Sequence, residues 1–320
     1  SFDRATTFPS SSPSLIHKFP PYSNMVPDTM KLITDNPFSF RIGSKSVLSS
    51  YTMDRLTPEE LRKQLEPLRK MSNQNILFLP QMIFVSLNDT KGRRLNGHDL
   101  YQIYRVRKTI PYSLIVCIEE YLRSYLDVCD GIYLGHFSSR TDDSFDESFT
   151  NEILLPIVNS VLSEPRYSGK KLFGIMVKTG YTSYYGAQNL SRDGTRTLRN
   201  FLESARLFHP DLIIGTEWDE LNEDTGFQPL ADKPMSNQRI IRYYMSLFKG
   251  VSPTPNPGDD LSIPNLIISQ RRQLMPGEIM KVELLNVPDS SSGAPCRVAL
   301  ELTDEQDKVV YGPEIMEFNT

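Results

Sequence analysis

The sequence predicts an α/β fold: a (β/α)8 TIM-type barrel that lacks its first strands in this chain, followed by a small antiparallel β-sandwich domain. Up to about residue 250, short apolar runs alternate with longer amphipathic stretches, which is typical of parallel strands joined by helices. Beyond a stretch rich in Pro, Ser, Thr and Asn, apolar and polar residues alternate and no helical pattern returns. We therefore expect a barrel over 1–250, a linker over 251–261 and a C-terminal β domain over 262–320.

The barrel elements follow from local signals. Residues 6–28 are rich in Ser, Pro and Thr and predict a long loop, after which Pro27-Asp28 opens a helical pattern. Thr57-Pro58-Glu59-Glu60 predicts a helix start, because a threonine cap, an early proline and early acids all favour one. Residues 84–108 are expected to form a long excursion. The expected strands lie near Phe2 and at 46–51, 76–80, 130–135, 172–177 and 212–214; further helices are expected at 113–126, 151–162, 195–208 and 237–248.

The number of predicted strands is smaller than a closed barrel needs. Six strands are readable up to residue 250, whereas a closed barrel of this type needs about eight. The chain also begins on what looks like the third strand, which would leave a strand edge unpaired. We expect a gap in the barrel that is filled by a missing N-terminal segment or by another chain.

Composition excludes several classes of function. The formal net charge of −4 gives no general attraction to nucleic acid or to an anionic membrane surface. No apolar run approaches the roughly 20 residues that a membrane-spanning helix needs. The three cysteines and four histidines show no ligand spacing, so we expect no metal site, no disulfide framework and no cofactor. Asn88 and Asn189 begin glycosylation sequons, which matter only in a secretory setting.

The stretch Ile213-Ile214-Gly215-Thr216-Glu217-Trp218-Asp219-Glu220-Leu221-Asn222-Glu223 is the most informative part of the chain. A buried strand ends here in a cluster of acidic residues around the only tryptophan. The carboxyl ends of barrel strands carry the chemistry of such folds. Paired carboxyl groups beside an aromatic ring suit cleavage of a glycosidic bond, because one acid protonates the leaving oxygen while the ring stacks on a sugar. Alternatively, these acids cap the next helix or form solvated ion pairs, and Trp218 is a core residue.

Other candidates lie near predicted strands. Asp3, Asp130 and Tyr181 are candidate substrate-binding residues, together with Trp218 and Asp219. Their alternative roles are satisfied polar groups at the rim and loop packing. Because parallel barrel strands deliver their ends to one face, we expect the acids, Asp130 and Tyr181 to converge in one cleft with Trp218.

Several of these segments resemble one group of enzymes. Ser1-Phe2-Asp3, Asp130-Gly131-Ile132-Tyr133 and Gly180-Tyr181 resemble strand ends of the family 71 glycoside hydrolases, the α-1,3-glucanases, and of related family 99-like barrels. Trp218-Asp219-Glu220-Leu221-Asn222-Glu223 is similar to the Trp-Asn-Asp-Tyr-Gly-Glu motif of family 71 and the Phe-Asn-Glu-Trp-His-Glu motif of family 99. Asp219, Leu221 and Asn222 depart from these motifs. The resemblance covers about residues 1–248.

The resemblance implies a glycosidase that cleaves polysaccharide, an endo-acting α-glucanase-like or mannan-active enzyme. Its paired acids fall on Glu220 and Glu223, with Glu223 as general acid and Glu220 as its partner. It also implies an extracellular, cell-surface or periplasmic location. Inversion and retention stay open, since the outcome depends on the separation of the carboxyl groups. The alternative is a catalytically inactive carbohydrate-binding or structural protein on a hydrolase-like barrel.

Overall fold

The computed structural model describes residues 35–51, 53–135, 147–182, 189–215, 217–219, 225–230, 235–260, 264–271, 274–288 and 295–318. The expected strand near Phe2 and the helical pattern after Pro27 lie outside these residues. Within them, the main element is a six-stranded sheet of order β1-β2-β3-β6-β7-β10. It comprises β1 (Arg41–Ile42), β2 (Lys45–Ser50), β3 (Ile76–Met82), β6 (Gly131–Leu134), β7 (Leu172–Val177) and β10 (Leu212–Gly215).

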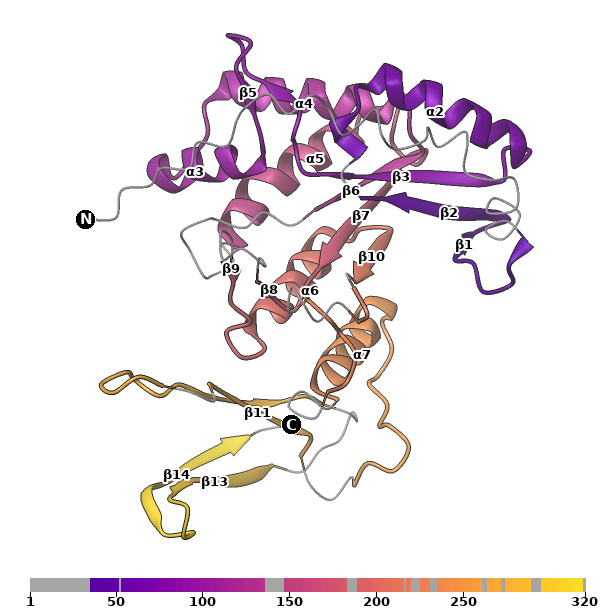
Figure 1. The fold of residues 1–320 in the computed structure, drawn as a ribbon. Helices are drawn as coiled ribbons and strands as arrows, with labels where there is room; N and C mark the ends of the chain where they lie inside the picture. The colour runs from indigo at the N-terminus through magenta and orange to yellow at the C-terminus, as the bar shows by residue number, and fades with distance from the viewer. Residues whose placement is uncertain are drawn as a thin grey trace.

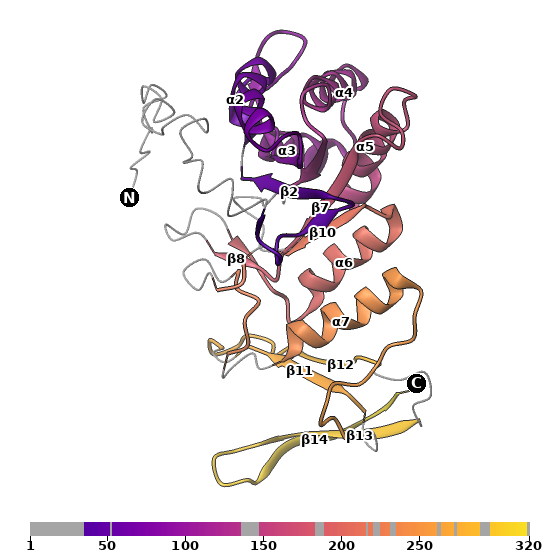
Figure 2. The same ribbon diagram turned by 90° about the vertical axis from the view of Figure 1, so that its right-hand side faces the viewer.

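The strands from β2 to β10 run parallel and follow one another in chain order, while β1 pairs antiparallel with β2. Helices connect successive parallel strands: α2 (Pro58–Met71), α4 (Tyr112–Leu126), α5 (Leu155–Leu162) and α6 (Arg196–Phe208), with α7 (Ser236–Lys249) after β10. Figure 2 shows these helices in an arc around the sheet. The described part of the chain is thus a curled half-barrel, as the alternating pattern predicts for a partial barrel.

Two apolar layers hold this half-barrel. Alternate strand residues such as Phe78, Ile132 and Phe173 pack against the helices in the larger core. The opposite face of the sheet carries a smaller cluster: Leu79, Tyr133, Met176 and Leu212. The period of two explains the division, because successive side chains of a strand point to opposite faces. Both faces are apolar, as expected of strands covered on both sides.

Helix α2 begins where its sequence signal predicts. The Thr57 side chain accepts a hydrogen bond from the Glu60 backbone N–H, and the Glu60 carboxylate accepts one from the Thr57 backbone N–H. This capping box satisfies amides that the helix leaves unpaired at its start. Leu61, Leu65 and Leu68 are then fully buried, each contributing about 1.5–3 kcal/mol by leaving water.

The excursion after β3 contains elements that periodicity did not reveal. It forms a short hairpin of β4 (Leu87–Asn88) and β5 (Arg94–Leu95), followed by helix α3 (Gly97–Arg107). Asn96 and Asp99 make a second capping box at the start of α3. A π-helical turn, η4 (Phe149–Leu154), leads directly into α5, and a 3-10 turn, η3 (Met53–Arg55), follows β2.

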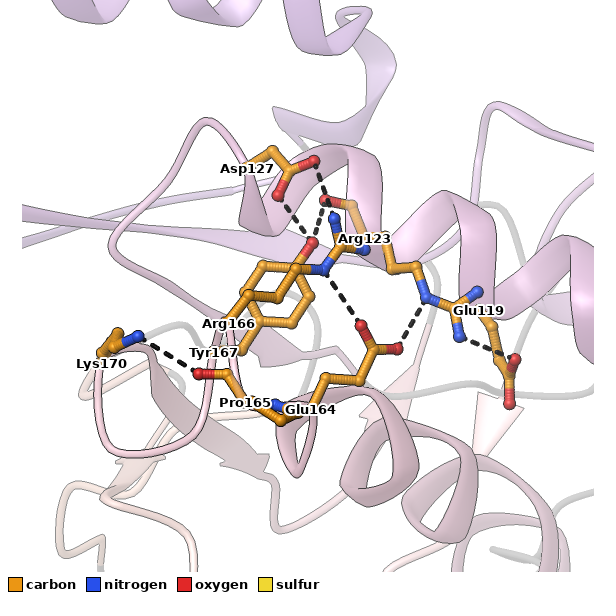
Figure 3. A network of polar contacts seen from close by, with 8 residues as sticks. All are labelled: Glu119, Arg123, Asp127, Glu164, Pro165, Arg166, Tyr167 and Lys170. Atoms are coloured by element: carbon orange, nitrogen blue, oxygen red, sulfur yellow. Dashed lines mark hydrogen bonds and ion pairs between the residues drawn. The ribbon is translucent and has the colours of Figure 1, made fainter.

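A network of charged residues braces the helical layer on the outside of the barrel (Figure 3). The Arg123 guanidinium bonds Glu119 on the same helix and Glu164, at 3.0 and 2.7 Å, and Arg166 bonds the other Glu164 oxygen at 3.0 Å. These hydrogen bonds hold the pKa of Glu164 below its usual range, and the bond from Arg123 has the largest effect. The Tyr167 hydroxyl donates to Asp127 at 2.6 Å. The network ties the end of α4 to the turn that precedes β7.

After α7 the described residues contain strands but no helix. These are β11 (Leu266–Gln270), β12 (Val282–Asn286), β13 (Cys296–Thr303) and β14 (Val309–Phe318). They pair antiparallel, as predicted, but as two separate two-stranded sheets, β11-β12 and β13-β14, rather than the expected sandwich. Figure 1 shows both sheets below α7.

The β11-β12 hairpin is attached to the barrel helices. Ile267 and Val287 share an apolar cluster with Leu198 and Leu202 of α6 and with Ile240 of α7. The Glu283 carboxylate accepts hydrogen bonds from the backbone N–H and the hydroxyl of Thr195, both at 2.8 Å. It therefore caps the start of α6, where a negative charge is favoured.

The linker is also held in place. Arg239 of α7 forms a two-pronged ion pair with Asp259, at 3.0 and 2.5 Å. The Arg239 guanidinium holds the pKa of Asp259 below its usual range. Arg242 bonds Asn256, the Thr254 hydroxyl and the Pro255 carbonyl. Two arginines on successive turns of α7 thus fix the segment that the sequence marks as a linker.

Candidate functional site

The carboxyl edge of β7 and β10 carries the candidate site. Val177 and Gly215 are the last paired residues of these neighbouring parallel strands. Lys178 and Thr179 follow β7 and are buried, whereas Glu217, Trp218 and Asp219 follow β10 and are exposed. Trp218 is 61% exposed, so it is not the core residue that one interpretation of the sequence allowed. An exposed indole beside carboxylates is suited to stacking on a sugar ring.

Backbone hydrogen bonds join the two ends of the acidic segment, residues 217–228. The Phe227 N–H donates to the Glu217 carbonyl at 3.2 Å, and the Gln228 N–H donates to the Trp218 carbonyl at 2.8 Å. The side chain of Gln238, on α7, donates to the Phe227 carbonyl. The two ends of this segment are therefore joined to each other and to α7.

Two hydrogen bonds donated by threonine hydroxyl groups link the ends of the acidic segment to the residues that follow β7. Thr225 is fully buried, and its hydroxyl donates to the Glu217 carboxylate Oε2 at 2.8 Å. The Thr225 carbonyl in turn accepts a hydrogen bond from the Thr179 hydroxyl at 3.2 Å. Residues that follow two neighbouring strands are thus connected through one buried threonine.

A buried cation lies at the same edge. Lys178 is 8% exposed, and its ammonium group lies 4.9 Å from the centre of the Tyr181 ring. Tyr181 begins the short hairpin of β8 (Tyr181–Thr182) and β9 (Asn189–Leu190). A positive charge with so little exposure favours negative charge nearby.

The predicted site residues fall into three groups. Tyr181, Trp218 and Asp219 follow β7 and β10 at the carboxyl edge. Glu220, Glu223 and Asp3 lie outside the described residues, so their assignments stay predictions. Asp130 lies elsewhere.

The expectation that Asp130 joins the carboxyl-edge cleft is wrong, because Asp130 precedes β6 rather than following it. Its Oδ2 accepts hydrogen bonds from the Phe78 backbone N–H and the Arg69 guanidinium, both at 2.9 Å. Asp211, before β10, similarly accepts from the Phe173 N–H at 2.8 Å. Both acids bind an amide of the preceding parallel strand at the amino edge, which points to a role in strand pairing.

Sequence reasoning missed four residues of the carboxyl edge: Lys178, Thr179 and Glu217 as functional candidates, and Thr225 as their link. A usable signal existed for the first two. A lysine and a threonine directly after an apolar strand mark the point where that strand leaves the core. Thr225 carried only a resemblance to the threonine that trails the family 71 and family 99 motifs, and its contact with Glu217 depends on how the intervening segment returns.

A second buried acid lies near the exits of β2 and β3. Asp54 is fully buried, and its Oδ2 accepts hydrogen bonds from the Ile83 N–H at 2.9 Å, the Val85 N–H at 3.4 Å and the Tyr121 hydroxyl at 3.1 Å. Its Oδ1 is buried without a hydrogen-bond partner among the described residues. Burial raises the pKa of this carboxyl, against the opposing effect of the three hydrogen bonds. Because Asp54 ties η3, the β3 exit and α4 together, we interpret it as a structural group.

The raised pKa of Asp54 predicts a pH-dependent stability. The folded state holds this proton more tightly than the unfolded state, so the contribution of Asp54 is fully present below about pH 4 and is lost as pH rises through the folded pKa. Asp54→Asn keeps an acceptor for the amides but does not titrate. We expect the free energy of unfolding of the wild type, relative to Asp54→Asn, to fall as pH rises above about 4 in urea titrations. Parallel curves for the two proteins would contradict the raised pKa.

Metal and membrane sites find no support in the part of the chain that is described. No group of three or more His, Cys, Asp or Glu side chains there could hold a metal ion. No helix of that part is long and apolar enough to cross a bilayer. Cys117, Cys129 and Cys296 are free thiols.

The fold and the site together define an α/β protein with a polar site at the carboxyl edge of a curled parallel sheet. Two solved structures are similar to the chain, both of the GH99 endo-alpha-mannosidase from Bacteroides thetaiotaomicron, at 16% identity. The complex with BIS-TRIS-propane gives a TM-score of 0.46 and covers 71% of this chain and 67% of that one; the other gives 0.45, 71% and 62%. No protein-family model and no curated protein matches the chain. At this identity and overlap the likeness identifies no family, and the function is argued from the site.

Proposed function

We propose that the protein is a glycoside hydrolase that cleaves within a polysaccharide chain. The observation that carries the proposal is the arrangement after β10, where an exposed tryptophan stands between exposed carboxylates at the carboxyl edge of a parallel sheet. Glycosidic cleavage needs two carboxyl groups and a surface that orients the sugar. The backbone hydrogen bonds that join the two ends of this segment restrict its movement, and positioning of a substrate requires such rigidity.

The proposed reaction uses Glu220 and Glu223, which continue this acidic segment. Glu223 protonates the leaving oxygen as general acid. Glu220 acts as base through water or assists a substrate hydroxyl. Burial or a neighbouring negative charge keeps a carboxyl group protonated near neutral pH, whereas a cation such as Lys178 favours an ionised one. The assignment requires these opposed influences to act on Glu223 and Glu220.

The proposed substrates are α-glucans or mannans, with Tyr181, Trp218 and Asp219 contacting the sugar. Asp3 belongs to this proposal through the resemblance of its segment alone. An extracellular, cell-surface or periplasmic location likewise stays a prediction from that resemblance.

The test measures cleavage and binding in parallel. Purified protein is incubated with α-glucans, β-glucans and mannans, and released reducing ends are quantified while affinity electrophoresis reports binding to the same polymers. We expect release from an α-glucan or a mannan, and loss of both binding and release in Trp218→Ala. Wild-type protein that neither binds nor cleaves any of these polymers would refute the proposal.

A carbohydrate-binding protein without activity is the second candidate. The exposure of Trp218 favours it, because stacking on a sugar needs no catalytic acid. Binding that depends on Trp218 in the absence of any released reducing ends would establish this function instead.

A further inference from the structure

The Thr225 hydroxyl makes a hydrogen bond that affects both of its partners. It donates to the carboxylate of an exposed glutamate, Glu217, although Thr225 itself is fully buried. An exposed glutamate could satisfy its oxygens with water alone. The bond satisfies the buried Thr225 hydroxyl, and it also restricts the rotamers of the exposed Glu217 side chain.

Thr225, which restrains the Glu217 side chain, is itself held in place by neighbouring elements. The Thr225 carbonyl is held by the Thr179 hydroxyl next to β7, and backbone bonds from Phe227 and Gln228 join the two sides of the segment. Glu217 is thus bonded through its Oε2 to a residue whose own position is set by two elements. Its other oxygen, Oε1, is the atom left for an outside partner.

We propose that Thr225 is a positioning residue that acts through Glu217, holding this carboxylate beside Trp218 so that Oε1 accepts a hydrogen bond from a hydroxyl group of the bound glycan. The proposal rests on the proposed function. A free glutamate side chain loses rotamer entropy when it binds a ligand, and a side chain ordered beforehand binds more tightly for that reason. A carboxylate acceptor and an exposed aromatic ring on consecutive residues, Glu217 and Trp218, match the hydroxyl groups and the apolar face of a sugar.

Two substitutions at one position test the idea. Thr225→Val replaces the hydroxyl with a methyl group of similar size, whereas Thr225→Ser keeps the hydroxyl. We expect Thr225→Val to raise the dissociation constant for the glycan that the wild type binds by about tenfold, and Thr225→Ser to stay within about twofold of wild type. Glu217→Gln retains an oxygen acceptor, so its dissociation constant for the same glycan should lie between those of the wild type and Glu217→Ala.

Ser204→Ala is the matched control. Ser204 is a buried hydroxyl residue on α6 that donates a hydrogen bond to the Asn200 carbonyl at 3.0 Å, away from Glu217 and Thr225. The substitution Ser204→Ala should lower the melting temperature about as much as Thr225→Val does, without weakening glycan binding. Equal weakening by Ser204→Ala, or unchanged binding in Thr225→Val, would overturn the inference. If the wild type itself binds no glycan, the proposed function has failed, which is a different outcome from a wild type that binds and a Thr225→Val that binds equally.

Discussion

Glu223→Gln is expected to lower the rate of glycan hydrolysis by about a thousandfold while leaving the fold and glycan binding intact. An amide keeps the shape of the side chain but cannot donate the proton that the leaving oxygen needs, and general acid catalysis contributes about 10²–10⁴ in rate. Glu220→Gln should also cripple turnover, because the partner carboxylate is then lost. The measurement is kcat and KM from reducing-end release, with the melting temperature as a check on folding.

Glu217→Gln is the comparison that makes this experiment specific. Glu217 lies three residues before Glu220, the same spacing that separates Glu220 from Glu223. A role in binding predicts that Glu217→Gln retains kcat within about tenfold. If Glu217→Gln abolishes turnover and Glu223→Gln does not, the assignment of the general acid to Glu223 is wrong.

Gly131→Ala is expected to destabilise the protein by at least about 3 kcal/mol. Gly131 pairs with Leu172 of β7, and a Cβ at position 131 would lie 2.2 Å from the Leu172 carbonyl oxygen. Backbone atoms cannot move aside as a flexible side chain can, so the ladder between β6 and β7 would have to shift. Urea denaturation measures the loss as a lower midpoint at an unchanged slope.

Gly215→Ala is the control for this prediction. At Gly215, the last residue of β10, the nearest atom to an added Cβ would be 3.8 Å away on the Phe227 ring. This is ordinary van der Waals contact, so we expect a change of less than about 1 kcal/mol. Equal destabilisation by the two substitutions would show that the clash with the Leu172 carbonyl is not the cause.

Strong periodicity made much of the parallel sheet predictable. The runs at 172–177 and 212–214 are short, apolar and flanked by helical patterns, and the structure places strands there. Helix α3 was missed because its apolar stripe is weak, although Asn96 and Asp99 carry a capping-box signal that was available. The sandwich was expected from alternation alone, which predicts strands but does not determine which strands pair.

The site was harder to predict than the fold. Asp130 was placed at the wrong edge because the resemblance treated the Asp-Gly segment as a strand end, although Asp130 is the first residue of the strand expected at 130–135. The Asp-Gly pair has a physical reason at the amino edge: Asp130 holds the Phe78 amide, and Gly131 leaves room for the Leu172 carbonyl. Thr225 acts through a contact that forms only after the chain has returned to Glu217.

The side-chain contacts of Arg239 and Arg242 on α7 limit how the protein can move. A linker rich in proline and glycine would ordinarily allow the strands beyond it to swing as a hinged flap. Here Arg239 and Arg242 hold the linker, and Glu283 attaches β12 to the start of α6. A hinge at 250–260 would have to break these bonds together, so large-amplitude closure over a bound ligand is not available from that direction.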